Sequence, residues 1–129
     1  MKKVSYASPD AGRFASRLLI GRRILLIEST HELPAALRGI AGALLSVSTF
    51  RLMTLETLYR TQPDVILAPL LSDGFDIIDV GTRLLEFGCD VPLRAFCGPV
   101  PNRTLVRREV LQACDGLDFD LLEVGPLRN

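Results

Sequence analysis

The sequence lacks an apolar run long enough to cross a membrane. Arg22 and Arg23 interrupt the apolar stretch from Leu18 to Ile27, whereas a spanning helix needs roughly 20 consecutive apolar residues. A secretory signal is also missing, because Lys2 and Lys3 are followed by polar residues rather than by an apolar core. With 129 residues, 48% of them hydrophobic, the chain is predicted to be one soluble, cytoplasmic globular protein.

Cysteine is scarce, and its spacing excludes two kinds of scaffold. Cys89, Cys97 and Cys114 are odd in number and do not have the spacing of metal ligands. A disulfide framework needs paired cysteines, so we expect reduced thiols instead. Internal repeats and low-complexity tracts are absent as well. The sequence predicts no metal site and no cofactor.

The formal net charge is zero, but the charges are unevenly distributed. Residues 1–23 sum to +5, which leaves −5 for the rest of the chain. A basic arm could contact nucleic acid, an anionic membrane or an acidic protein, or could fold back on the acidic body. The negative body and the few basic residues argue against nucleic acid. We therefore divide the chain into a basic N-terminal arm, 1–21, and a folded domain, 22–129.

Short apolar segments alternate with helical patterns along the chain. Strands are predicted at 23–28, 46–50, 65–67, 91–96 and 119–124, and helices at 33–45, 55–61, 75–87 and 103–114. Such alternation with short connections predicts a doubly wound α/β fold with helices on both faces of a parallel sheet. Five strands favour the flavodoxin-like order 2-1-3-4-5, with the strand in PDVILAPLLSDG, residues 63–74, at the centre.

Several short polar residues stand where these helices should begin. Ser29 and Glu32 form the S-x-x-E pattern of a capping box before the first predicted helix. Thr54, Asp73 and Asn102 precede the next three helices and could accept hydrogen bonds from free amides there. The pattern also predicts which side chains face the sheet. In the helix after Thr54 these are Leu55, Leu58 and Tyr59. In the helix after Asn102 they are Leu105, Val106, Val110 and Ala113.

Four segments resemble the sheet of the receiver domains of bacterial response regulators. They are RILLIES (23–29), PDVILAP (63–69), VPLRAFCG (91–98) and GLDFDLLEV (116–124). The similarity covers about residues 22–124. It implies a receiver-like, CheY-like fold and a place in two-component signal transduction. In that family an acidic pair after the first strand holds magnesium, an aspartate ending strand three accepts phosphate, and a hydroxyl and a lysine end strands four and five.

The chain departs from the family at most of these positions. Glu28 and Ser29 stand at the acidic pair, Pro69 at the phosphoacceptor, Cys97 at the hydroxyl and Glu123 at the lysine. Without a carboxylate at the acceptor position there is no nucleophile for phosphoryl transfer and one magnesium ligand fewer. A glutamate in place of lysine reverses the charge that would stabilise a phosphate. The resemblance thus implies a pseudo-receiver without enzymatic activity, which acts by binding another signalling or regulatory protein.

The final helix of a receiver has no counterpart after Val124. The sheet face that it would cover is apolar, and exposing it costs roughly 25 cal/mol per Å². The amphipathic segment Ala11–Ile20 could fold back over this face, because Phe14 and Leu18 are four residues apart. The same helix, or the uncovered face, could instead join two copies into a homodimer.

Two other functions stay open at this point. Asp73, in the loop after the central strand, could be a displaced phosphoacceptor. Alternatively, Cys97 and His31 could form a nucleophilic site, with Glu28 or Glu32 orienting the histidine, in a small α/β enzyme. Each of these residues also has an ordinary structural interpretation. Asp73 could be a helix cap, Cys97 a buried cysteine and His31 a solvated histidine.

Overall fold

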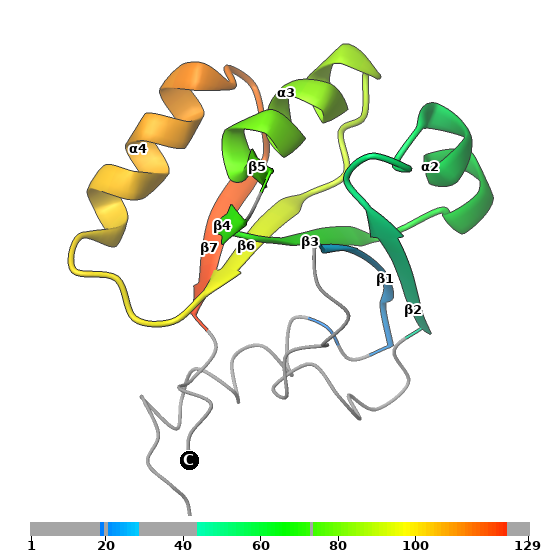
Figure 1. Cartoon of the computed structure of the whole chain (residues 1–129), viewed down its shortest axis with the longest axis horizontal. Helices are drawn as coiled ribbons and strands as arrows, with labels where there is room; N and C mark the ends of the chain where they lie inside the picture. Colours follow the sequence, from blue (N-terminus) through cyan, green and yellow to red (C-terminus); the bar gives the residue numbers. More distant parts are fainter. Residues whose placement is uncertain (1–18, 20, 29–43, 73, 124–129) are drawn as a thin grey trace, which may run out of the picture.

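The computed structural model describes residues 19, 21–28, 44–72 and 74–123, and its main feature is a five-stranded parallel sheet (Figure 1). The strands lie side by side in the order β2-β1-β3-β6-β7. Counted in chain order within this sheet, that is the predicted order 2-1-3-4-5, so the parallel α/β architecture is confirmed. The strands are β1 (Arg23–Glu28), β2 (Leu44–Thr49), β3 (Val65–Pro69), β6 (Leu93–Cys97) and β7 (Phe119–Glu123).

The inner strands are buried on both faces, as their continuous apolar sequences require. Residues 24–27 of β1 and 65–68 of β3 are all buried. Alternate side chains enter two separate apolar clusters. The first contains Leu25, Ile27, Ile66, Ala68, Leu93, Ala95, Phe119 and Leu121, and the second contains Leu19, Ile24, Leu26, Val65, Leu67 and Leu122. The sheet therefore has an apolar core against each of its faces.

The helices α2 (Leu55–Thr61), α3 (Ile77–Glu86) and α4 (Arg103–Ala113) lie on one face of the sheet. They add Leu58, Ile77, Val80, Leu84 and Val110 to the first cluster. Each fully buried side chain of this kind stabilises the fold by about 1.5–3 kcal/mol. No helix in the described part of the chain is long and apolar enough to span a membrane.

One residue of the basic arm is described on the opposite face. Leu19 is 1% exposed and belongs to the second cluster. The amide of Arg22 donates a hydrogen bond to the Leu19 carbonyl over 3.1 Å, and Gly21 has a φ of 71°, which turns the chain into β1. This end of the predicted helix Ala11–Ile20 thus packs against the face away from α2, α3 and α4. The rest of that helix, and the predicted helix start at Ser29–Glu32, lie outside the described residues.

Strand β2 begins two residues before its predicted start. Leu44 is in register with Arg23 of β1, and its amide donates to the Arg22 carbonyl over 2.9 Å. Pairing with β1 therefore makes Leu44 and Leu45 strand residues, and the prediction of a helix reaching Leu45 was wrong. The prediction that this strand lies at an edge of the sheet is confirmed.

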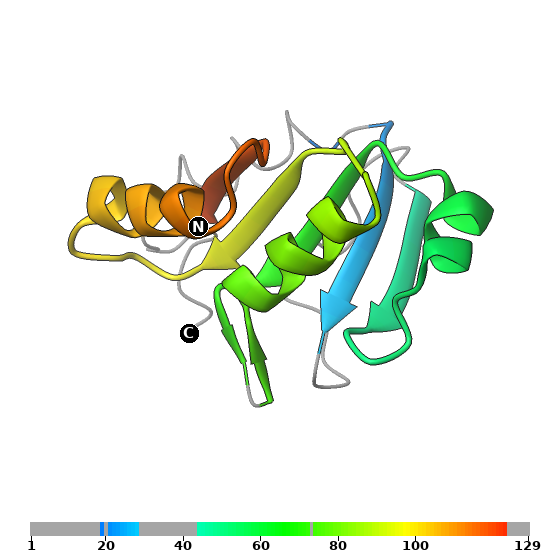
Figure 2. The ribbon, with the colours of Figure 1, turned by 90° about the horizontal axis from the view of Figure 1, so that it is seen from above.

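The start of α3 differs from the sequence prediction. Residues after β3 form a small antiparallel hairpin, β4 (Leu71–Ser72) and β5 (Phe75–Asp76), which projects beyond the sheet (Figure 2). Asp76, not Asp73, caps the helix. Its carboxylate accepts from the Asp79 amide, and the Asp79 carboxylate accepts from the Asp76 amide, each over 2.9 Å. Asp73 itself lies outside the described residues.

The caps at Thr54 and Asn102 are confirmed. The Thr54 hydroxyl accepts from the Thr57 amide over 3.3 Å, and the Asn102 side chain accepts from the Leu105 amide over 3.0 Å. The predicted inward faces were wrong in part, because each helix touches the sheet along a narrow stripe. Leu55, Tyr59, Leu105 and Ala113 are exposed, whereas Leu58 and Val110 are buried and Val106 is half-buried.

The observed cap gives a prediction about stability. Asp76→Ala should lower the free energy of unfolding by about 1 kcal/mol, because the Asp79 amide loses its acceptor at the start of α3. The measurement is urea unfolding followed by circular dichroism, with Asp73→Ala as the matched control. A larger loss from Asp73→Ala than from Asp76→Ala would contradict the assignment of the cap.

Candidate functional site

The residues predicted for the degenerate phosphorylation pocket end neighbouring strands of the sheet. Glu28 ends β1, Pro69 ends β3, Cys97 ends β6 and Glu123 ends β7. Since all these strands are parallel, their carboxyl ends share one edge of the sheet, and Figure 2 shows the strands in this arrangement. Cys97 and Glu123 are direct neighbours in the ladder between β6 and β7. Ser29 and His31 lie outside the described residues.

Glu123, which the resemblance to receivers aligns with a lysine, is neutralised by a cation from α4. The Arg103 guanidinium lies with Nη1 3.3 Å from Oε2 of Glu123, and its Nη2 donates to the Leu121 carbonyl over 3.1 Å. Asp120 adds a second carboxylate, 3.7 Å from Arg103. The Arg103 side chain is 46% exposed, so this ion pair is worth little stability. Its importance is that the carboxylate of Glu123 has a fixed positive neighbour.

The sequence did not predict this role of Arg103. A signal was nonetheless present, because Asn102 was correctly identified as the cap of the helix that follows β6. Arg103 directly follows that cap and therefore lies in the first turn of α4, at the same edge of the sheet as the strand ends. Which carboxylate it would reach could not be read from the sequence, because this depends on how α4 crosses β7.

Cys97 lies in surroundings that disfavour the thiolate. Burial raises the pKa of the Cys97 thiol, the nearby Glu123 carboxylate raises it further, and Arg103 lowers it. The net direction is upward, so the sulfur stays protonated at neutral pH. A nucleophilic or metal-binding cysteine requires the opposite, a thiolate stabilised by its surroundings. All three cysteines are free thiols.

Pro69 brings no reactive group to the middle of the edge. It is half-buried and in register with Phe96 of β6. The following residue, Leu70, donates its amide to the Phe96 carbonyl over 3.1 Å, and the chain then enters the β4–β5 hairpin. The side chain at the end of β3 is therefore a pyrrolidine ring that has neither charge nor lone pairs for a metal.

Glu28 keeps a carboxylate at this edge. The residue is half-buried, and its Oε1 atom is shielded from solvent. Within the described residues, no group of three or more His, Cys, Asp and Glu side chains could hold a metal ion. The described part of the edge thus combines one partly buried carboxylate, a proline, a neutral thiol and an Arg–Glu ion pair.

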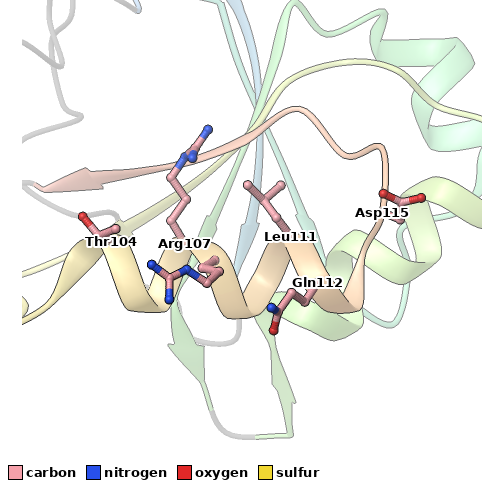
Figure 3. A pocket seen from close by; sticks show the side chains of 6 residues that line it. Thr104, Arg107, Leu111, Gln112 and Asp115 are labelled. Atoms are coloured by element: carbon pink, nitrogen blue, oxygen red, sulfur yellow. The ribbon is translucent and has the colours of Figure 1, made fainter.

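A shallow pocket of about 420 Å³ lies on the outer surface of α4 (Figure 3). Arg107 lines it and also contacts Asp120 of β7, with Nε 3.6 Å from Oδ1. The lining consists of Thr104, Arg107, Arg108, Leu111, Gln112 and Asp115, with both polar and apolar atoms of these side chains facing the pocket. Such an open pocket suits contact with another surface better than enclosure of a small ligand.

We compared the chain with protein-family models, with curated proteins and with solved structures, and none of them matches it.

The charges around Cys97 give a prediction about its reactivity. Glu123→Gln removes a negative neighbour, so the pKa of the Cys97 thiol should fall and its alkylation by iodoacetamide should have a midpoint at lower pH. Arg103→Met removes the positive neighbour and should move the midpoint to higher pH. The rate at each pH is measured by peptide mass spectrometry. The alkylation rate of Cys89 in the same samples is the internal control, and equal midpoints at Cys97 in all three proteins would contradict this electrostatic account.

Proposed function

We propose that the protein is a receiver-like, flavodoxin-like domain that has lost phosphorylation and acts as a protein-interaction module in bacterial signal transduction. The observation that carries this proposal is the set of residues at the carboxyl edge. The sheet has the strand order expected of a receiver, and Glu28, Pro69, Cys97 and Glu123 end the strands whose ends form the receiver's reaction site.

The chemistry of that edge supports a non-phosphorylated domain. Phosphoryl transfer to a protein needs a nucleophile and groups that stabilise the negative charge of the transferred phosphoryl group. Pro69 supplies no nucleophile. The guanidinium of Arg103 lies beside the end of β7, and Glu123 at 3.3 Å already neutralises it. An incoming phosphate would have to compete with that carboxylate.

Regulation would then depend on contact rather than on phosphate chemistry. The surface that fits this role is the outer side of α4 beside β7. Arg107 and Arg108 line the pocket there, and both residues are exposed. An acidic partner surface would complement these guanidinium groups. A partner that binds one conformation of the domain more tightly than another would shift the population between them.

The enzyme alternative is less well supported. A nucleophile at Cys97 would need a lowered pKa, whereas burial and Glu123 raise the pKa of this thiol. The proposed base, His31, and the displaced acceptor, Asp73, both lie outside the described residues, so no geometry supports either of them.

Treatment with acetyl phosphate and magnesium tests the proposal. We expect the intact mass of the purified protein to stay unchanged, because Pro69 has no nucleophilic group at the end of β3. A protein with a functional receiver domain, treated in parallel, is the positive control. A phosphoryl adduct on the wild-type chain would contradict the proposal. Its loss in Asp73→Asn would identify the displaced acceptor, and its loss in Cys97→Ser would identify a cysteine nucleophile.

A further inference from the structure

The outer edge of β2 is an unusual feature of the sheet. This strand ends the order β2-β1-β3-β6-β7, so no other strand of the described residues pairs with its outer side. It is six residues long, with the sequence LLSVST. Natural edge strands are normally protected against pairing with other chains by charged residues, proline, bulges or short length. β2 has no charged residue and no proline, and it pairs with β1 without a bulge over all six residues.

The register determines which backbone groups point outward. The amide of Leu44 donates to Arg22, so Leu44, Ser46 and Ser48 direct their backbone groups toward β1. The backbone N–H and C=O groups of Leu45 and Val47, which alternate with these, point away from the sheet. A second strand could accept and donate hydrogen bonds along this edge.

The apolar side chains of β2 are exposed beside that edge. Leu45 is 40% and Val47 is 54% exposed. They are in register with Ile24 and Leu26 of β1, which belong to the second cluster, so they lie on the sheet face away from α2. Ser46 and Ser48 lie on the other face. The exposed leucine and valine of this uncharged strand form an apolar surface. Burying that surface against another chain would lower the free energy.

We propose that two copies of this chain pair through their β2 strands, antiparallel, into one continuous sheet. A two-fold axis through Ser46 places Leu45 opposite Val47 of the other copy. Because both residues direct their backbone groups outward, each such pair exchanges two hydrogen bonds. The same register brings the exposed leucine of each copy against the exposed valine of the other, which is a favourable cross-strand pair.

The strand favours a second copy over a charged partner. β2 carries no charge that would repel its own copy, and the formal net charge of the chain is zero, which removes long-range repulsion between copies. Figure 2 shows α2 beside the edge strand. Leu52, Leu55 and Tyr59, which follow β2 in the chain, are also exposed, by 66%, 43% and 68%.

A charge substitution on β2 tests the pairing. Leu45→Lys should weaken dimerisation by about tenfold or more, because it places an ammonium group in both symmetric leucine–valine pairs. The matched control is Leu105→Lys on α4, since Leu105 is 44% exposed against 40% for Leu45. Sedimentation equilibrium over a range of concentrations measures the dissociation constant. A monomeric wild-type chain, or equal weakening by both substitutions, would overturn the proposal.

Cross-linking tests the register separately. In the proposed pairing the two Ser46 residues face each other as a non-hydrogen-bonded pair, with Cα atoms about 4.5 Å apart, which a disulfide can bridge. Ser46→Cys should therefore form a disulfide-linked dimer under mild oxidation. Ser48→Cys should not, because Ser48 lies opposite Leu44 of the other copy. Peptide mapping distinguishes this bond from links through the native cysteines.

The cross-linking result also separates the other possible occupants of the edge. A disulfide between the introduced cysteines of two Ser46→Cys chains, with circular dichroism unchanged from wild type, supports the antiparallel dimer. Faster cross-linking through Ser48→Cys would exclude the register that we propose. A wild-type chain that stays monomeric, yet binds an added peptide with the sequence of residues 44–49 along this edge, would show strand addition by a peptide instead of a dimer and would overturn the proposal.

Discussion

The burial of β3 on both faces is the constraint on which the rest of the structure depends. Its residues 65–68 are fully enclosed, so the strand must occupy the middle of the sheet, with apolar side chains packed above and below it. The strands on either side run parallel to it, and their carboxyl ends come to one edge. Pro69, Glu28 and Cys97 therefore share that edge because of how the core packs, and no interaction among these three residues is needed to place them there.

The electrostatics of that edge follow from one helix. α4 begins at Arg103 and brings this residue to Glu123, so the carboxyl end of β7 carries an ion pair. The same carboxylate and the surrounding burial keep the Cys97 thiol protonated by raising its pKa. In the described part of this edge, Pro69 thus brings no nucleophile, and the guanidinium of Arg103 already has a carboxylate beside it. Two surfaces lie apart from this edge: the guanidinium groups on α4 at one end of the sheet and the uncharged strand β2 at the other.

Much of the architecture could be predicted from the sequence because it depends on local patterns. Buried apolar runs predicted the inner strands, and Thr54 and Asn102 predicted two helix starts. The error at Asp73 arose because Asp73 and Asp76 are both capable caps, and the short β4–β5 hairpin that decides between them has too few residues to leave a pattern. The pairing of Arg103 with Glu123 was also missed, because the two residues are far apart in the chain and meet only when α4 packs on β7.

The most direct measurement is an amide NMR titration of the purified protein with magnesium and then with beryllofluoride, which mimics the phosphorylated aspartate of receivers. Our account predicts that the amides of Glu28, Leu70 and Cys97 keep their chemical shifts at every concentration, since Pro69 brings no acceptor carboxylate to the end of β3 and the guanidinium of Arg103 is already paired with Glu123. Saturable shifts of these amides would show a phosphate-responsive site and would contradict the account.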